Sequence, residues 1–415
     1  MPLKFLTVNK LRVIYNLAAY LKELNNLNFF RWHFFKPILI ALTLLGLSLS
    51  ACAYSATNKN WPLWSDFKTK FVQTDGRVIA SGAPNFQSFS EGQSYAMFFA
   101  LVADDQASFE SIWHWTKENL MGNNVNDTLP AWLWGVSEDG HWGVIDQNSA
   151  SDADIWIAYS LLEAGRLWKN DTYTSDALKM ITKIEAVEVV TIPSLGKFLL
   201  PGQLGFIQVD KYLTQFNPSY MPLPVLRRLA LASPQGPWDE IATNTVLMLS
   251  ANNPKGFAVD WLSYENTPLA TPGFIVDPLK SDLGSYDAIR VYLWAGMTSK
   301  KDPLAVPLMK SLVGITEATL KNGAPPEVIN IQQGTFNGIA PIGFSAALLP
   351  YFKANNQTYA LNKELARVNK KLDDISSTQQ LEAPELGYYD HVLCLFGMGW
   401  MEKRYQFMPS GKLNN

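Results

Sequence analysis

The sequence is poor in cysteine, histidine and charge. Its 415 residues include two cysteines and four histidines, and charged residues make up 17% of the chain, against about 25% in average soluble domains. Two cysteines exclude a disulfide framework. The histidines stand apart, with no His-Glu-x-x-His pattern and no Cys/His spacing, so we expect no metal site. P-loop, Gly-x-Gly-x-x-Gly and Gly-x-Ser-x-Gly motifs are also missing, so we expect no cofactor.

A recognisable domain linker is missing as well. No low-complexity or Pro/Gly/Ser-rich stretch follows residue 60, and 47% of the residues are hydrophobic, enough for a large core. We therefore expect one domain over residues 57–415, acting as a monomer. Its formal charge is about −8, because the preceding segment carries six basic residues and one acid while the whole chain sums to −3. A mildly acidic surface gives no reason to expect nucleic acid or anionic membrane as a partner.

The first 56 residues have the character of an export signal. A basic region is followed by the uncharged run "PILIALTLLGLSLSACAYSA", residues 37–56, which ends in small residues. We expect this leader to be cleaved, which would make the mature chain periplasmic or secreted. Two alternatives stay open. The run is just long enough to be an uncleaved membrane anchor, and "LSAC" resembles a lipobox, which would place a lipid on Cys52.

Helical periodicity dominates the rest of the chain, in segments of two kinds. Six segments are apolar nearly all round and open with polar and aromatic residues: 90–103, 151–165, 217–230, 285–297, 342–352 and 388–400. Six others carry charge on one face: 61–72, 107–120, 171–189, 237–252, 302–322 and 356–374. The two kinds alternate. A helix that is apolar on every side has to be enclosed, and an amphipathic one has to cover something. The pattern therefore predicts an all-α fold, an (α/α)6 toroid of six inner and six outer helices.

This toroid would bring the polar openings of the inner helices together. Each inner helix is reached through an outer one, so the inner helices run parallel and their N-termini meet at one end, where they would line a single cleft. Residues 193–212 and 256–282 alternate more like short strands or long loops, and we expect them to wall this cleft. The inner segments that start at 217 and 342 contain prolines, which makes them the weakest members of the pattern.

Acidic residues gather at these helix openings. They are Glu91, Asp152, Asp154, Asp287 and Asp390, and Arg290 follows one turn after Asp287. Paired carboxyl groups without a metal pattern are what glycosidic cleavage needs, since one donates a proton and another activates water or attacks. Alternatively, each acid could serve its own helix as a cap or as a partner of the macrodipole. We prefer that interpretation for Asp154 and Asp390.

Glu91 differs from the other acids because Ser90 already offers a capping side chain. A helix N-terminus lowers the pKa of an acid, so a proton donor at this position needs apolar burial or a like-charged neighbour such as Asp152 to raise its pKa.

Aromatic residues accompany the acids. Trp132 and Trp134 in "PAWLWG", together with Trp142, Tyr159, Tyr220 and Tyr286, offer flat apolar faces with polar edges, which suit pyranose rings. Packing in the core is the alternative for each of them. We expect Trp132 and Trp134 to bind substrate.

Four blocks of the sequence resemble glycoside hydrolase family 8. "ASDADIWIAYSLLEAGRLW", residues 150–168, is similar to the family signature, and "SEGQSYAM", "FNPSY" and "SYDAIRVYLWAGM" resemble its other blocks in the same order. With "WPLWSDFK", "PAWLWG", "GFSAALLP" and "LFGMGW", the order resembles the periplasmic endoglucanases associated with bacterial cellulose synthase. The likeness covers residues 61–405. It implies the (α/α)6 fold and the hydrolysis of β-1,4-glycans, mostly cellulose, with inversion.

The resemblance also implies roles for single residues. Glu91 matches the general acid, Asp287 the general base, and Asp152 the carboxylate that holds the distorted sugar in the central subsite. Tyr220 matches a tyrosine that helps to place the water.

Tyr286 and Arg290 match neighbours of the base. We therefore expect an inverting endo-β-1,4-glucanase whose partner is a cellulose chain, with a functional association with a cellulose synthase complex. Two alternatives stay open: a non-catalytic glycan-binding scaffold that guides a polymer, and a family 8 enzyme that acts on xylan or chitosan.

Overall fold

The computed structural model describes residues 60–80, 86–251, 253–377 and 385–414. The expected leader and Cys52 lie outside the described residues. Trp61–Asn415 forms one compact unit. In the described part of this unit, no helix is both long enough and apolar enough to cross a membrane.

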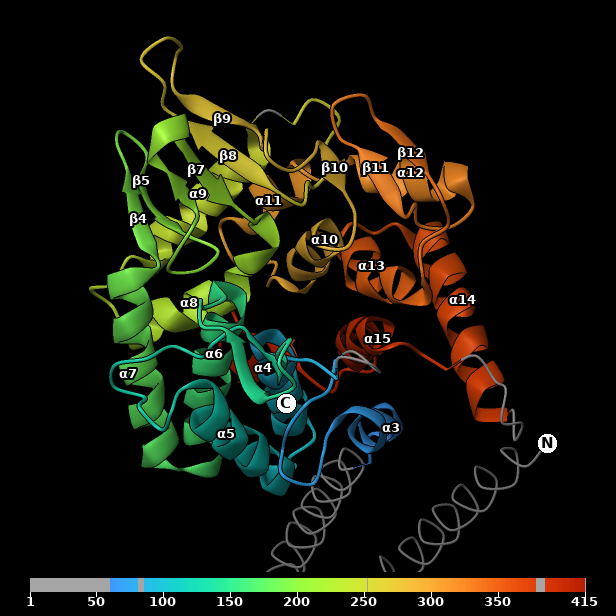
Figure 1. Cartoon of the computed structure of the whole chain (residues 1–415). Coiled ribbons are helices and arrows are strands. Elements are labelled where there is room, and N and C mark those ends of the chain that lie inside the picture. Colours follow the sequence, from blue (N-terminus) through green and yellow to red (C-terminus); the bar gives the residue numbers. More distant parts are fainter. Residues whose placement is uncertain (1–59, 81–85, 252, 378–384, 415) are drawn as a thin grey trace, which may run out of the picture. The chain divides into compact units, whose positions relative to one another are not determined.

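Inner and outer helices alternate along the described chain (Figure 1). The inner helices are α4 (Ser90–Val102), α6 (Ser151–Trp168), α8 (Leu223–Ala232), α10 (Ala288–Met297), α13 (Ile342–Ala354) and α15 (Tyr388–Met401). The outer helices are α3 (Pro62–Phe71), α5 (Gln106–Leu120), α7 (Asp171–Val187), α9 (Trp238–Ser250), the pair α11 (Ala305–Lys310) and α12 (Gly314–Asn322), and α14 (Thr358–Ser377). The predicted (α/α)6 toroid is confirmed.

Burial explains why the two kinds of helix differ in composition. Every residue of α6 from Ser151 to Gly165 is buried, whereas α3 buries only Trp64 and Phe67. A helix enclosed on all sides has no place for solvated charge, and a covering helix needs only one apolar stripe.

Aromatic rings fill the centre of the toroid. Phe396 of α15 stacks on Phe98 of α4 with ring centroids 5.5 Å apart, and it meets Trp294 of α10 edge to face at 5.1 Å. Trp156 of α6 lies 5.0 Å from Phe98. Full burial of such side chains contributes roughly 1.5–3 kcal/mol each. Four inner helices are therefore held together by one aromatic cluster.

Prolines change two of the predicted inner helices. The segment predicted as one helix from residue 217 is split into a 3-10 turn, Pro218–Tyr220, and α8, because Pro222 and Pro224 allow a helix to start only around them. Pro350 lies inside α13 and cannot donate to the carbonyl of Ala346. That carbonyl packs instead against Gly397 of α15, where any Cβ would collide with it.

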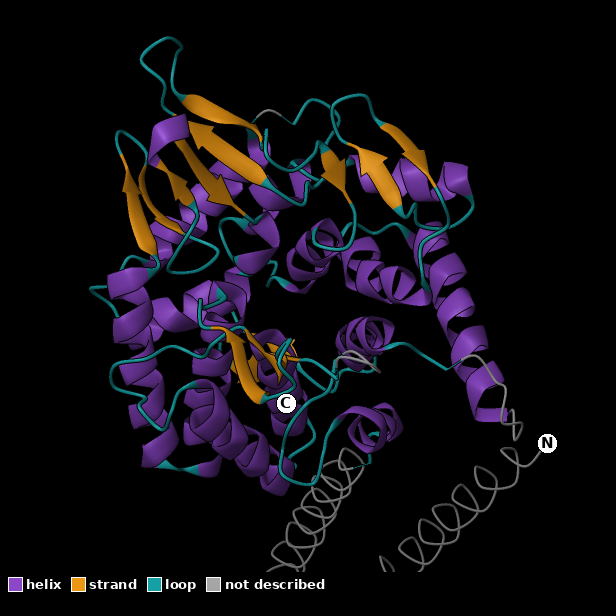
Figure 2. Ribbon diagram, viewed as in Figure 1, coloured by secondary structure: helices purple, strands orange, loops and turns teal. Residues whose placement is uncertain are grey.

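Short antiparallel strands connect the helices (Figure 2). One sheet contains β1 (Ser88–Phe89), β2 (Leu133–Val136) and β3 (Trp142–Asp146); a second contains β6 (Ile207–Gln208), β7 (Leu213–Phe216), β8 (Leu262–Glu265) and β9 (Gly273–Val276); a third contains β10 (Leu283–Gly284), β11 (Val328–Asn330) and β12 (Thr335–Asn337). The hairpins are β4 (Val189–Ile192) with β5 (Gly196–Leu199), and β13 (Gln406–Phe407) with β14 (Leu413–Asn414). The strands and loops predicted over 193–212 and 256–282 are confirmed.

The sheets are attached to the starts of the inner helices. β1 runs directly into α4, β7 is followed by the turn Pro218–Tyr220 before α8, and β10 precedes α10. The strands of these three sheets therefore lie at the end of the toroid where the inner helices begin, whereas the β13–β14 hairpin follows the end of α15.

Candidate active site

Arg290 is the centre of a buried polar cluster at this end of the toroid. Its side chain is only 4% exposed. Its guanidinium donates to five side chains: Nη1 to Glu91 Oε2, to Tyr95 Oη at 3.1 Å and to Asp152 Oδ2 at 3.4 Å, and Nη2 to Asp287 Oδ1 at 2.6 Å and to Ser219 Oγ at 3.1 Å. We call these six residues the Arg290 cluster. A planar guanidinium with several donors suits such a junction better than a lysine would.

The helix starts place the acids of this cluster. Glu91 and Asp152 lie in the first turns of α4 and α6, and Asp287 is the N-cap residue of α10. Because all three contact one guanidinium, the N-termini of these inner helices converge, as the alternation of helices predicted.

The carboxylates of the cluster differ in exposure. Asp152 is 3% exposed, while Glu91 and Asp287 are 25% and 30% exposed. Asp152 therefore lies at the base of the cluster, and Glu91 and Asp287 can meet a molecule that arrives from solvent.

Asp152 lies close to one negative and one positive side chain, those of Glu91 and Arg290. Burial, together with the carboxylate of Glu91, raises the pKa of Asp152 well above its usual range, against the opposing effect of Arg290. Two carboxyl groups that share one cation in a buried place favour the retention of a proton between them. Asp152 is therefore suited to hold a proton at the base of the cluster.

Two tyrosines flank the cluster. The ring of Tyr220 lies 5.7 Å from Arg290 Cζ, and burial, with the charges of Asp152 and Asp287, raises the pKa of its hydroxyl, which therefore stays protonated.

Tyr286 is more open, with 44% of its surface exposed. Its hydroxyl donates to Glu327 Oε1 at 2.9 Å, and its carbonyl accepts a 2.5 Å hydrogen bond from the Tyr389 hydroxyl. Both contacts hold the residue that directly precedes Asp287.

The two predicted tryptophan subsites have different surroundings. The carbonyl of Trp132 accepts a hydrogen bond from the amide of Ser90, next to Glu91, and its ring stacks on Phe89 at 5.7 Å. Trp134 is covered by the guanidinium of Arg77 at 4.2 Å and by the stacked ring of Trp142 at 5.3 Å. Trp142 is 53% exposed. Of this stacked pair, Trp142 therefore offers the more open face.

Asp154 stands in the first turn of α6 but accepts no hydrogen bond from an amide of its own helix, so of the two structural roles that we preferred, that of a macrodipole partner stays a prediction. The N-cap residue of α6, Ala150, has no side chain that could cap it, and Asp154 is fully buried beside Glu188, the residue that ends α7. Burial and this like-charged neighbour raise the pKa of Asp154, and burial raises the pKa of Glu188 to about 7. The Ser149 hydroxyl donates to Glu188 Oε1 at 2.5 Å. Asp154 and Glu188 therefore form a buried carboxyl pair beside the start of α6, and burial favours the protonated form of both groups.

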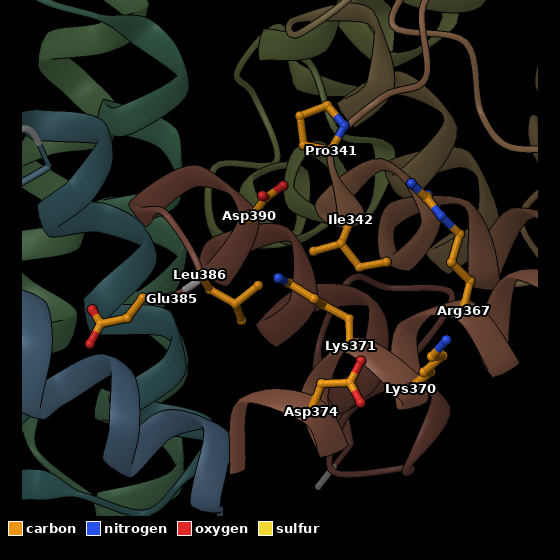
Figure 3. A pocket seen from close by; sticks show the side chains of 9 residues that line it. All are labelled: Pro341, Ile342, Arg367, Lys370, Lys371, Asp374, Glu385, Leu386 and Asp390. Carbon is orange, nitrogen blue, oxygen red and sulfur yellow. The ribbon is translucent and has the colours of Figure 1, made fainter. Parts of the chain in front are cut away.

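Asp390 lies apart from the Arg290 cluster. Its Oδ1 accepts from the amide of Gly343 at 2.8 Å, so it caps the neighbouring helix α13. It also lines a surface pocket of about 460 Å³ together with Ile342, Arg367 and Lys371 (Figure 3). These contacts support the structural role that we preferred for Asp390.

The sequence did not identify three residues that matter here. Tyr95 and Ser219 belong to the quoted blocks, one turn after Glu91 and directly before Tyr220, so their positions were a usable signal. Asp260, whose Oδ1 accepts from the amides of Ser285 and Ala288, had no local signal at all.

Metal ligands do not gather in this part of the molecule. Over the described residues, no group of three or more histidine, cysteine, aspartate or glutamate side chains stands in a position to hold a metal ion.

Comparisons with known proteins agree with one another. The sequence model of the family described as "Glycosyl hydrolases family 8" matches residues 36–403. An "Endoglucanase" of Pseudomonas fluorescens (strain SBW25) is 45% identical over 379 residues, which cover 90% of this chain and 95% of that protein. An "Endoglucanase" of Xanthomonas axonopodis pv. citri (strain 306) is 44% identical over 91% and 96% of the two chains.

A solved structure has the same architecture. The crystal structure of an endo-1,4-D-glucanase from Vibrio fischeri ES114 superposes with a TM-score of 0.78 and 37% sequence identity, covering 86% of this chain and 99% of that one. The likeness therefore extends over the helices that carry the Arg290 cluster.

Proposed function

This chain belongs to glycosyl hydrolase family 8 and is an endoglucanase, and from that premise we propose that it cleaves internal β-1,4 bonds of cellulose with inversion of the anomeric configuration. One observation carries the proposal: a single guanidinium, that of Arg290, joins Glu91, Asp152 and Asp287 at the end of the toroid where the inner helices begin.

Asp287 is the general base in this proposal. An inverting base has to be ionised so that it can take a proton from the attacking water. Asp287 accepts a hydrogen bond from Arg290 Nη2 at 2.6 Å, and its 30% exposure leaves it open to a water. Tyr220 lies against the same guanidinium and keeps its hydroxyl proton, so it can help to orient that water.

Glu91 is the general acid. It is the more exposed member of the carboxyl pair that Arg290 joins to Asp152. Glu91 is the member of the pair that an incoming glucan can reach, so it is the one placed to deliver a proton to the leaving oxygen. Asp152 beneath it would hold the distorted sugar ring of the central subsite, where its contact strengthens as charge develops.

Aromatic residues on both sides of the cluster would bind the flanking sugars. Trp132 is tied to Ser90 beside the acid, and Tyr286 directly precedes the base. Trp134 would support the open ring of Trp142, which stacks on it. Rings with an apolar face and a polar edge suit the faces and hydroxyls of a glucan chain.

The experiment is a comparison of variants on soluble carboxymethylcellulose. Wild-type protein should release reducing ends, and Glu91→Gln and Asp287→Asn should each lower kcat by about 10²–10⁴-fold, the usual contribution of general acid–base catalysis, without a change in the melting temperature. Asp390→Asn is the matched control, because Asp390 also stands in the first turn of an inner helix but outside the cluster. NMR of the first product should show the inverted anomer.

Two results would argue against the proposal. Full activity of either variant would remove the assigned role, and a wild-type protein that binds cello-oligosaccharides without producing new reducing ends would be a glycan-binding scaffold. Parallel assays on xylan, chitosan and mixed-linkage glucan test the substrate, since higher kcat/KM on one of these would replace cellulose.

We also propose that residues 1–56 export the chain and that it acts in the periplasm or outside the cell, where it trims glucan made by a cellulose synthase complex. Fractionation of cells that express the full chain and its Cys52→Ser variant tests both export and a lipid anchor. A processed, soluble periplasmic product from both would leave no role for Cys52.

A further inference from the structure

Asp260 lies beside the first turn of α10, on the segment that leads into β8. Its Oδ1 accepts hydrogen bonds from the amide of Ser285 at 2.9 Å and from the amide of Ala288 at 2.8 Å. The first amides of a helix have no acceptor within the helix and need one from elsewhere. Asp260 therefore caps α10 from another part of the chain.

Because Asp260 accepts from these amides, Asp287 does not have to cap α10. It is the N-cap residue of α10, where an aspartate ordinarily accepts from the amides of its own helix. Its side chain makes no such bond and contacts Arg290 instead. With Asp260 accepting from the amide of Ala288, the carboxylate of Asp287 can turn toward the cluster.

Tertiary contacts hold Asp260 in place. Its own amide donates to the carbonyl of Leu283 at 2.9 Å, and the amide of Ala258 donates to the Tyr292 hydroxyl of α10 at 2.8 Å. Gly284 packs so closely on the carbonyl of Ala258 that any Cβ there would collide with it. The segment that carries Asp260 is thus fastened to both sides of the turn that carries Asp287.

We propose that Asp260 is a positioning residue for the general base: it caps α10 in place of Asp287 and so directs the Asp287 carboxylate toward the reaction centre. This inference rests on the proposed function, which makes Asp287 the base.

The charge of Asp260 also acts on the site. The titratable and charged groups that face it are Asp287, Arg290 and Tyr292 of α10 and Tyr389 of α15. Burial and the charge of Asp287 raise the pKa of Asp260 to about 6. Above that pH, Asp260 adds a second negative charge next to the base.

Two substitutions separate the cap from the charge. Asp260→Asn keeps an oxygen that can accept both amides but removes the charge, while Asp260→Ala removes both. We expect Asp260→Ala to lower kcat on carboxymethylcellulose by about ten- to a hundredfold, the effect of a misplaced catalytic group, with little change in KM. We expect Asp260→Asn to restore kcat to within a few-fold of wild type and to remove from the kcat/KM profile the step near pH 6 that ionisation of Asp260 produces in wild type.

Asp105→Ala is the matched control. Asp105 caps the outer helix α5 through the amide of Ser108 at 3.2 Å, far from the cluster in the fold. This control should lower the melting temperature but leave kcat and the pH profile as in wild type, because it removes a cap without touching the base.

Three results would overturn the inference: wild-type kcat in Asp260→Ala, an Asp260→Asn variant as impaired as Asp260→Ala, or an unmoved pH profile in Asp260→Asn. If Asp260→Ala fails to fold, the profile of Asp260→Asn decides alone. Failure of the proposed function can be distinguished from these three results. In that case the wild-type protein would release no reducing ends, or Asp287→Asn would stay active.

Discussion

Arg290 donates through Nη2 to Oδ1 of Asp287 at 2.6 Å, one turn earlier in the chain. The contact joins a nearly buried cation to a partly exposed carboxylate. Through Nη1, the same guanidinium reaches Glu91 and Asp152 on two other inner helices. A change at Arg290 therefore acts on three acids of three inner helices at once.

Removal of the cation should destabilise the protein in a pH-dependent way. Arg290→Met leaves three carboxylates without their shared partner, and breaking a buried ion pair from one side costs about 3–5 kcal/mol. We expect that loss at pH 7 and a smaller one at pH 4.5, since protonation relieves the repulsion between the acids. Urea unfolding at both pH values measures it.

Lys70→Met is the control for Arg290→Met. It breaks a surface pair with Asp66, which should change the free energy of unfolding by about 1 kcal/mol or less. An Arg290→Met variant that loses equal stability at both pH values would contradict the linkage between the cation and the acids.

Neutralisation of Asp152 should separate activity from stability. Asp152→Asn keeps an oxygen that can accept from the Ala153 amide, as Asp152 Oδ1 does at 2.8 Å. The substitution removes a buried carboxyl group whose pKa is raised by burial and by Glu91. The melting temperature at pH 7 should therefore be equal to or above that of wild type. We expect kcat to fall by about 10²–10³-fold, because a preorganised electrostatic contact is lost. An active Asp152→Asn variant would exclude a role in the central subsite.

The carboxyl pair of Asp154 and Glu188 should make stability fall as pH rises. The pKa of Glu188 is about 7 in the folded protein against an ordinary value of 4.5, so the folded state holds a proton that the unfolded state releases. The free energy of unfolding is therefore unaffected below about pH 4.5. Between about pH 4.5 and about pH 7 it falls progressively, by about 3 kcal/mol in total.

Glu188→Gln should reduce that dependence, because the glutamine is neutral at every pH and can still accept from Ser149, while burial still raises the pKa of Asp154. Glu317→Gln on the exposed surface of α12 is the control and should follow wild type. Urea midpoints between pH 4.5 and 8 test the pair. Parallel curves for wild type and Glu188→Gln would mean that Glu188 does not hold the proton.

The open tryptophan should affect long substrates more than short ones. Trp142 is 53% exposed and is supported by Trp134. We expect Trp142→Ala to raise KM about tenfold on long glucans, which corresponds to about 1.4 kcal/mol, with kcat unchanged. Tyr359→Ala, at an exposed position of the outer helix α14, is the control. Equal KM values for wild type and Trp142→Ala on every chain length would remove Trp142 from the substrate path.

Local patterns were sufficient to predict the architecture. The alternation of all-apolar and one-sided helices predicted the toroid, since each helix shows in its own sequence how much of its surface must be buried. The same alternation predicted that Glu91, Asp152 and Asp287 would meet. Two inner helices differ from this prediction because of prolines. Pro222 decides where α8 starts, and Pro350 affects the packing of α13.

The tertiary structure decided which partner each acid at a helix opening contacts. Asp152, Asp154 and Asp390 all occupy first turns, yet one joins Arg290, one lies buried beside Glu188, and one caps a neighbouring helix. The sequence by itself determined which segments are helical, which face they bury and which acids stand at their openings, because periodicity is a local property. Only the fold decided the partners, because partners such as Glu188, Asp260 and Arg290 come from other segments and are brought into contact by the packing of whole helices.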